Sequence, residues 1–574
     1  MSVELTAQEP SAKYLAALQP PPLVRHFDLI AQAPGSVARL RELILTLAVQ
    51  GKLVPQDPSD EPASVLLQKI RAEKDRLIAE GKIKRDKLLA EIADEEKPFD
   101  LPVGWSVVRL SDLVRVLNGR AYSKQELLEA GPTPVLRVGN LFTSNHWYYS
   151  DLELETDKLC VEGDLLYAWS ASFGPFIWPG PKAIFHYHIW KLDPFAPAHI
   201  DVQYLHTFLL EKTAEIKAAG HGVSMVHMTK EKMEKILVPL PPLEEQSRIV
   251  ICVEELMQLC DALEASGQLE AQQHAQVVGT LLGTLTQSET PEALADNWQR
   301  IATHFDLLLD RPEAVDALEQ TILQLAVRGL LVPQDPTDEP ASVLLQKIRT
   351  EKDDLIAQGK IKRDKPLPPI TDEEKPFELP QGWEWVRLGS ISEFTNGFAF
   401  PSSEFTSNTS GIGVIKIGDI QNGEVSVAGM SYVSNEYAEG VDRAFDVLHG
   451  DLLIAMSGAT TGKLGFNRQH KRFLLNQRVG KIDLLLVDEQ FAFQYLTTKI
   501  LENLAISAGS AIPNLSTSQI KEITFPLPPL AEQSRIVSRV NELRALCADL
   551  RRGLVAGQQV QGRMATALTE NMTA

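Results

Sequence analysis

The chain has 574 residues and a formal net charge of −20, with 44% hydrophobic and 23% charged residues. This length exceeds what one hydrophobic core supports, so at least two domains are expected, and the composition is typical of soluble globular proteins. No stretch of 18 apolar residues occurs, and residues 1–17 carry Glu4 and Glu9 where a secretory signal would have a basic segment. We therefore expect no transmembrane helix, no secretory signal and a cytoplasmic location.

Motifs for catalysis and for metal binding are missing from the sequence. The four cysteines form no C-x-x-C pair, and the twelve histidines include no H-E-x-x-H. The run from Gly458 to Leu464 is one residue shorter than a phosphate loop, and Leu464 stands where the magnesium-binding Ser or Thr belongs. Glu95-Glu96-Lys97 lacks the strand aspartate of a nuclease site. We expect a chain with no active site, no metal and no cofactor of its own.

The sequence is a tandem duplication. Residues 51–87 match residues 329–365 at 32 of 37 positions without a gap, and residues 239–250 match residues 526–537 with one difference. Each copy has a helical lead-in, a mixed module containing glycine and aromatic residues, and a closing helix. The nearly identical helical parts flank modules that share only short anchors. Because the helical scaffold is alike in the two copies whereas the modules differ, we expect two recognition units for two different targets.

Helical periodicity is clear on either side of each module. Val37, Leu40, Ile44 and Leu47 follow a helical spacing, and a second helix is expected from about Pro62 to a stop at Gly81. A closing helix is predicted from Leu243 to about Gln287, or ~65 Å. It and its copy carry heptad seams with the same spacing. The seam residues are Ile249, Val253, Leu256, Cys260 and Leu263 in the first copy, and Ile536, Val540, Leu543, Cys547 and Leu550 in the second.

Two packing arrangements are open for these seams. Each seam could pack on its own module. We favour the alternative, in which the two closing helices, together with the lead-ins, pair antiparallel into one shared spine related by a pseudo-twofold axis.

Within the modules, the shared anchors predict strands. Residues 135–141 and 414–420 alternate apolar and other residues, as a half-buried strand does. Gly163-Asp164 and Gly450-Asp451 each read as a turn into a buried strand. These anchors imply that the two modules share a framework.

The charge is distributed unevenly. Residues 105–242 carry a net charge of −2 and residues 383–529 of −4, so the remaining −14 lies outside the modules. A window at 452–482 has no Asp or Glu and holds several cations and amides, side chains that pair with base edges. The matching window at 165–192 is aromatic, and we expect most of its rings in the core.

Candidates for DNA contact follow from these windows and from the anchors near them. In the first module they are Arg120, Lys124, Arg137, Trp169, Lys182, His186 and His188. In the second they are Lys416, Lys463, Asn467, Arg468, Lys471, Arg472, Asn476, Gln477, Arg478 and Lys481.

A separate basic cluster follows the second lead-in helix of each copy. It consists of Lys82, Lys84, Arg85 and Lys87, repeated as Lys360, Lys362, Arg363 and Lys365. Cations past a helix C-terminus complement the helix dipole whatever the function, and contact with phosphates or with a partner is the alternative.

The doubled run PLPPLxEQSRIV at 239–250 and 526–537, the run GKLVPQ at 51–56 and the tandem layout resemble the DNA specificity subunit of type I restriction–modification systems. The resemblance covers about residues 26–574. Ile512-Pro513-Asn514-Leu515-Ser516 also resembles the family's motif before the closing helix, whereas the first copy departs from it with Met225 to Thr229.

The resemblance implies an α+β protein with two mixed α/β target recognition domains, separated and joined by long antiparallel helical conserved regions. Double-stranded DNA, two methylation subunits and motor-nuclease subunits would be its partners. S-adenosylmethionine, ATP and magnesium would sit on those subunits. A standalone methyltransferase or nuclease, or a coiled-coil protein that does not bind DNA, are the alternatives. The expected parts are a flexible leader (1–25), an N-terminal helical region (26–104), recognition domain 1 (105–242), a central helical region (243–382), recognition domain 2 (383–529) and a C-terminal helix pairing with the central helix (530–574).

Overall fold

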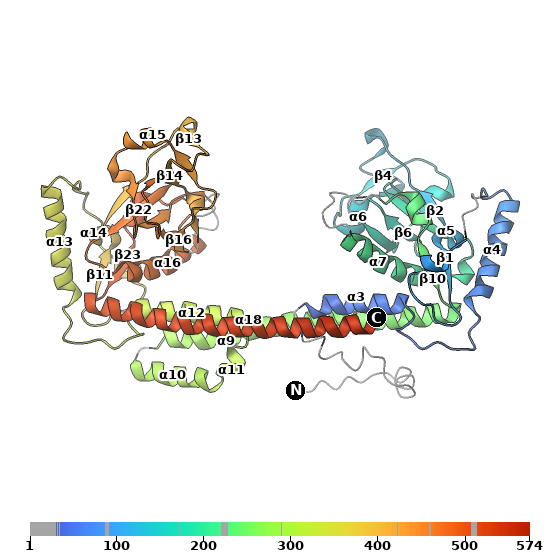
Figure 1. The fold of residues 1–574 in the computed structure, drawn as a ribbon, viewed down its shortest axis with the longest axis horizontal. Coiled ribbons are helices and arrows are strands. Elements are labelled where there is room, and N and C mark those ends of the chain that lie inside the picture. The colour runs from blue at the N-terminus through green and yellow to red at the C-terminus, as the bar shows by residue number, and fades with distance from the viewer. Residues whose placement is uncertain are drawn as a thin grey trace. The chain divides into compact units, whose positions relative to one another are not determined.

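The structure is a computed structural model, and it describes residues 30, 33, 35–85, 91–170, 173–219, 228–288, 290–421, 423–458, 461–506 and 514–573. These residues form two compact units, which we treat separately. Unit 1 contains residues 1–270 together with 557–574, and unit 2 contains residues 271–556. Figure 1 labels the elements of each unit. The duplication is therefore visible as two units, but the last turns of the chain belong to the first one.

Unit 1 has a helical base. It consists of α3 (Ser36–Val49), the first part of α9 (Leu243–Thr286) and the last part of α18 (Leu530–Thr573). Helix α4 (Ala63–Ala79) starts directly after Pro62, which suits the first turn of a helix. It ends before Gly81, whose φ of +70° is a left-handed conformation that glycine adopts without strain. The predicted lead-in helices and the long closing helix are confirmed.

The module of unit 1 is built from two four-stranded sheets. One has the order β2-β9-β6-β7 and the other the order β4-β3-β8-β5. A separate antiparallel pair, β1 (Ser106–Arg109) and β10 (Leu237–Leu240), lies at the module's two ends in sequence. The remaining bounds are β2 Val114–Asn118, β3 Thr133–Leu136, β4 Tyr148–Ser150, β5 Leu159–Cys160, β6 Leu165–Ala168, β7 Gly174–Ile177, β8 Ala183–Phe185, β9 Ile189–Pro194, α5 Leu110–Leu113, α6 Val138–Phe142, α7 Val202–Ala219 and α8 Lys230–Glu234.

Unit 2 repeats this plan with larger sheets. They have the orders β12-β22-β19-β20-β16-β15 and β13-β17-β14-β21-β18, and β11 pairs with β23. The strands are β11 Glu384–Arg387, β12 Ser392–Asn396, β13 Phe405–Thr406, β14 Ile412–Ile415, β15 Ile420–Gln421, β16 Gly423–Val425, β17 Ser431–Val433, β18 Asp446–Val447, β19 Leu452–Ala455, β20 Leu464–Phe466, β21 Phe473–Leu475, β22 Val479–Leu484 and β23 Thr524–Leu527. The helices are α10 Pro291–Thr303, α11 Phe305–Leu308, α12 Pro312–Val327, α13 Ala341–Ala357, α14 Leu388–Ile391, α15 Asn435–Glu439, α16 Glu489–Ile506 and α17 Thr517–Lys521.

Only the first part of each alternating segment, 135–141 and 414–420, forms a strand. β3 ends at Leu136 and the chain then turns into α6, where the Asn140 side chain accepts the Arg137 N–H at 3.1 Å. In unit 2, β14 ends at Ile415 and a short 3-10 turn follows. The prediction of strands over 135–141 and 414–420 is therefore wrong in its second half. The buried strands after the Gly-Asp turns are confirmed as β6 and β19.

The seam residues pack where the closing helices meet the lead-in helices and each other. In unit 1, Ile249, Val253 and Cys260 are buried against α3 and against Leu568 and Met572 of α18. In unit 2, the seam of α18 is buried against α12 and against the end of α9. Each seam is thus covered within its own unit by a lead-in helix and by the final turns of the other long helix. The favoured arrangement, in which the two closing helices pack antiparallel together with the lead-in helices, is therefore confirmed.

The Glu-Gln-Ser-Arg motif fastens each module to its long helix. The buried Gln246 side chain accepts the Asp201 N–H at 2.9 Å and donates to the Pro241 carbonyl at 3.0 Å. Arg248 pairs with Asp60 at 2.6 Å, which ties α9 to the segment before α4. The same contacts recur in unit 2 with Gln533, Asp488, Pro528, Arg535 and Asp338. The repeated motif therefore fixes each module to the long helix that follows it.

Candidate nucleic-acid interface

Corresponding turns join the two sheets of each module, and we call them the sheet-junction turns. In unit 1 the turn is His186–His188, between β8 and β9. In unit 2 it is Asn476–Arg478, between β21 and β22. Each is closed by one backbone hydrogen bond, from Ile189 N–H to the His186 carbonyl (2.9 Å) and from Val479 N–H to the Asn476 carbonyl (2.8 Å). The same backbone therefore presents His-Tyr-His in one module and Asn-Gln-Arg in the other.

A glycine holds each turn in place by close approach. A Cβ atom on Gly119 would lie 2.3 Å from the His186 carbonyl oxygen, and one on Gly397 would lie 2.1 Å from the Asn476 carbonyl oxygen. The following residues, Arg120 and Phe398, each pair with the turn's backbone. The Asn-Gly anchors found in both copies are thus explained, because no larger residue fits against the turn.

The turn of unit 1 is aromatic and uncharged at neutral pH. The Tyr187 side chain is 39% exposed and packs against the ring of His186, with centroids 4.5 Å apart. Burial, with the nearby His188 and Arg137, lowers the pKa of His186 to about 4. The Trp169 indole donates to the Tyr187 carbonyl at 2.9 Å. This turn offers planar rings and neutral imidazole donors and acceptors.

Around the first turn, the predicted cations are held to different degrees. Arg120 pairs with Glu126 at 2.6 Å, while its buried Nη1 has no hydrogen-bond partner among the described residues. Arg137 is exposed and lies over the ring of Tyr148 at 5.2 Å. Lys124 is exposed in the segment that follows Arg120. An arginine beside the turn thus keeps one unused buried donor, which is unusual in a folded protein.

The turn of unit 2 is polar and basic. Gln477 and Arg478 are exposed, and the Asn476 side chain accepts the Arg478 N–H at 3.4 Å. The Arg478 carbonyl accepts the Met456 N–H at 2.9 Å, which brings the loop after β19 to the turn. In that loop the buried Ser457 hydroxyl has no partner among the described residues. This surface offers amide and guanidinium groups that suit hydrogen bonding to base edges.

Three predicted contacts in unit 2 are structural. Asn467 is fully buried and donates to the Leu448 carbonyl at 2.8 Å. Arg472 pairs with Asp446 at 2.7 Å. Lys481 has a mostly buried side chain and pairs with an acidic residue from the Gly-Asp turn, Asp451, at 3.7 Å, and with Asp483 at 3.5 Å. The prediction of Asn467 as a DNA contact is wrong because the residue is fully buried, whereas Arg472 and Lys481 are held by acids that neighbouring strands and turns supply and the window itself lacks.

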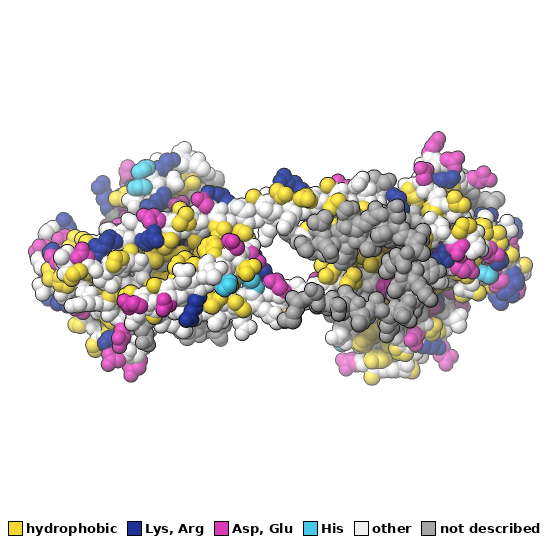
Figure 2. Space-filling view, turned by 90° about the horizontal axis from the view of Figure 1, so that it is seen from below, with side chains coloured by type: hydrophobic (Ala, Val, Ile, Leu, Met, Phe, Trp, Pro, Cys, Tyr) yellow, Lys and Arg dark blue, Asp and Glu magenta, His cyan; other side chains and the backbone are white. Residues whose placement is uncertain are grey.

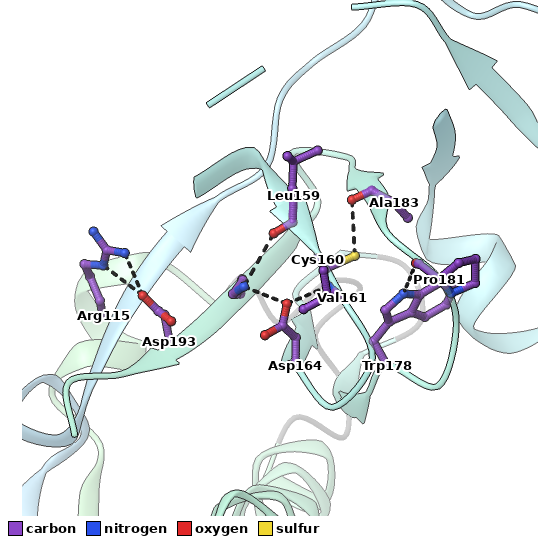
Figure 3. Close-up of polar contacts among 10 residues, drawn as sticks. Arg115, Leu159, Cys160, Val161, Asp164, Trp178, Pro181, Ala183 and Asp193 are labelled. Carbon is purple, nitrogen blue, oxygen red and sulfur yellow. Dashed lines mark hydrogen bonds and ion pairs between the residues drawn. The ribbon is translucent and has the colours of Figure 1, made fainter. Parts of the chain in front are cut away.

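Unit 1 shows the matching core pair in detail. Lys191 donates to the Asp164 carboxylate at 2.6 Å and to the Leu159 carbonyl at 3.5 Å. Asp164 also accepts the Val161 N–H at 2.7 Å (Figure 3). The adjoining Cys160 thiol is buried, which raises its pKa to about 12 and makes it unreactive. Lys191 and Lys481 therefore serve the framework in both modules.

The remaining candidates are spread over the modules. Lys463, Arg468 and Lys471 are exposed around β20 and the hairpin that follows it, and Lys182 is exposed before β8. Lys416 donates to the Ser431 hydroxyl at 2.8 Å and lies over the Phe405 ring. Figure 2 shows one face of the molecule, on which basic and acidic side chains are interspersed. The structure brings together only those candidates that lie on or beside the turns.

Sequence reasoning missed the correspondence of the turns, because it compared the windows only as compositions. A signal was present: Phe185 and Ile189 flank one turn as Leu475 and Val479 flank the other. Ser457 was missed as well, because an unpaired buried hydroxyl cannot be seen in a sequence. The motif at 512–516 lies partly outside the described residues, and of it Asn514 pairs with the backbone of Ser457.

Comparison with known proteins identifies the family. The domain described as "Type I restriction modification DNA specificity domain" matches residues 102–272 and 380–556. The chain belongs to this family. It is 39% identical to the type I restriction enzyme EcoAI specificity subunit and 34% identical to the EcoEI specificity subunit, both of Escherichia coli. Each comparison covers 93% of this chain and 93% of the relative.

A solved structure from work on the assembly and conformational transition of a type I restriction–modification system is 17% identical, with a TM-score of 0.48. It covers 83% of this chain and 99% of that chain. As a specificity subunit, the present chain recognises DNA sequence within a restriction–modification complex, and catalysis lies in other subunits. Among the described residues, no helix is long and apolar enough to cross a membrane, and no group of three metal-binding side chains occurs.

Proposed function

We propose that this specificity subunit reads a bipartite DNA site, one half with each module, and that the sheet-junction turns make the base contacts. One observation carries the proposal: turns closed by corresponding backbone hydrogen bonds present His186–His188 in one module and Asn476–Arg478 in the other. Asn or Gln pairs with adenine, and Arg pairs with guanine, through two hydrogen bonds each. Neutral histidines donate or accept single hydrogen bonds. The two halves of the site would then differ in sequence.

Unpaired polar groups beside the turns support the same assignment. Arg120 Nη1 and Ser457 Oγ are both buried without partners among the described residues, and each lies next to a turn. Such groups lower the stability of a protein unless a ligand satisfies them. Because Nη1 of Arg120 is inaccessible to solvent, a base or phosphate at the turn would accept its hydrogen bond only once the Arg120 side chain rotates outward.

The net charge of the two modules indicates what the partner subunits must contribute. The two modules are slightly acidic, so the chain alone lacks much of the positive field that DNA binding needs. We propose that two methylation subunits supply that field together with S-adenosylmethionine, and that motor-nuclease subunits bring ATP and magnesium. The subunit itself would position these partners on the site that it reads.

Methylation mapping tests the assignment. In cells that carry the whole system, we would replace Asn476–Arg478 with the His-Tyr-His of the first turn. The expected result is a changed or relaxed second half-site with the first half unchanged. The reciprocal exchange at His186–His188 should change only the first half. An unchanged site in both strains would contradict the role of the turns, and methylation by the purified chain alone would contradict a non-catalytic subunit.

A further inference from the structure

Two basic loops stand apart from the turns. The sequence GKIKRDK occurs without change at 81–87 and at 359–365, directly after α4 and α13. Of the first loop, residues 82–85 are described. Gly359 has φ of +69°, as Gly81 does of +70°, and the left-handed residue ends the helix and turns the chain into the loop. We call residues 82–85 and 360–365 the basic loops.

The second basic loop is exposed and largely uncompensated. Lys360, Lys362, Arg363 and Lys365 are all exposed. Arg363 forms a 3.5 Å pair with Asp353 in which both side chains are more than 70% exposed, so the pair is weak. Among the described residues, the three lysines have no ion-pair partner. In a chain of net charge −20, this is a local concentration of available positive charge.

A chain of contacts places this loop near the second sheet-junction turn. Lys521, at the end of α17, pairs with Asp364 of the loop at 2.7 Å. At the start of α17, the Thr517 hydroxyl bonds to the Asn396 side chain at 2.9 Å. Asn396 precedes Gly397, the residue that packs against the turn. Since α17 rises only ~6 Å from Thr517 to Lys521, the loop lies one short helix away from the turn.

The helix that carries the loop is fixed to the module as well. Figure 1 shows α13 running alongside the sheets of unit 2. Lys352 of α13 pairs with Glu393 at 2.8 Å and donates to the carbonyls of Gly389 and Ser392. In unit 1, Lys74 of α4 donates to the Ser111 carbonyl at 2.9 Å. The loops are therefore held at a defined position beside each module.

We infer that the basic loops bind the phosphate backbone of the DNA beside each half-site. This inference rests on the proposed function. Side chains that read bases must differ between two different half-sites, and the turns do differ. Phosphates are the same in every sequence, so a phosphate-binding loop can be identical in both copies, as GKIKRDK is. An acidic surface on a partner subunit is the competing occupant.

Salt-dependent binding of the assembled methylation complex tests this inference. The test variant is Lys360→Gln with Lys362→Gln. The control is Lys347→Gln with Arg349→Gln, which removes the same number of exposed cations from α13 itself, one of them, Lys347, paired with Glu339 at 2.7 Å. Affinity is measured for a duplex with the mapped site and for a random-sequence duplex, between 50 and 200 mM salt. Size-exclusion chromatography monitors assembly.

Each phosphate contact contributes ~0.9 to the slope of log affinity against log salt. For two lost contacts, the salt-induced loss of affinity over this fourfold range should be about twelvefold smaller than for the wild type, on both duplexes. The ratio between the duplexes should stay constant, and the control should match the wild type. An unchanged slope, or a loss of assembly in place of DNA affinity, would overturn the inference. Since the random duplex offers the turns no half-site to read, a failure of the turns to set specificity would appear separately, in the ratio between the two duplexes.

Discussion

Replacing Gly397 with alanine should weaken recognition of one half-site only. The new Cβ atom would lie 2.1 Å from the Asn476 carbonyl oxygen and 2.6 Å from the Leu475 carbonyl oxygen. An ordinary contact between carbon and oxygen is about 3.3 Å, so the turn or the strand end must move by about 1 Å. Both obstacles are backbone atoms, which no side-chain rotation can relieve. The second sheet-junction turn is therefore displaced, while the first is left intact.

A displacement of about 1 Å takes a hydrogen bond out of its normal range of about 2.7–3.2 Å. Each good base contact contributes about 1–3 kcal/mol of discrimination, so the affinity for the mapped site should fall about 5- to 150-fold. The assay is competition binding by the assembled complex, with duplexes in which one or the other half is scrambled. Scrambling the half read by unit 2 should then change the affinity of the variant complex only slightly, whereas scrambling the other half should lower the affinity as much as it does for the wild type.

Gly418→Ala is the matched control, because nothing lies within 4 Å of a Cβ atom at Gly418 in the same module. Gln477→Ala provides a second variant that places no strain on the fold, since its side chain is exposed. It should reduce the preference for the same half-site. If Gly397→Ala behaves as the control does, or if Gln477→Ala leaves the preference for that half unchanged, the turn does not read bases.

Other predictions concern residues with structural roles. Arg472→Gln should lower the stability of unit 2 by about 1 kcal/mol, through loss of the partly exposed pair with Asp446, and leave the methylated sequence unchanged; a changed sequence would contradict this. His186 has a lowered pKa of about 4, so its contribution to stability is present above pH 6.5 and is lost as the pH falls towards 4; His186→Gln should flatten the thermal melting profile over that window. Arg535→Gln removes the ion pair with Asp338 and should lower the free energy of unfolding of unit 2 by about 1–2 kcal/mol in denaturant titrations. An unchanged midpoint would show that this ion pair does not stabilise the unit.

The helical parts of this fold were predictable because their signals are local. Pro62 and Gly81 mark the ends of α4, and the prolines before Leu243 mark the start of α9. The strand predicted through Asn140 failed for a local reason too. The Asn140 side chain bonds to the Arg137 N–H, which favours a helical turn over continuation of the strand. A two-residue alternation cannot show that competition.

The candidate site was only partly predictable, because burial and pairing depend on contacts distant in sequence. The window at 452–482 lacks acids, yet Asp451 and Asp483 pair with its Lys481. The heptad seams, by contrast, correctly predicted that α9 and α18 pack with each other and with the lead-in helices. What the window did contain, Gln477 and Arg478, remains exposed at the second sheet-junction turn.

Unit 1 combines segments from the two ends of the sequence, and this affects the order in which its parts become available during translation. Leu568 and Met572 complete the cluster around α3 and the start of α9, and Arg39 and Lys52 donate to the carbonyls of Gly562 and Thr573. At about 5–20 residues per second, the ribosome delivers those last turns tens of seconds after α3. Unit 1 is thus begun first and finished last. Until residues 557–573 have been made, the apolar residues of α3 and of the start of α9 lack the cover that Leu568 and Met572 provide.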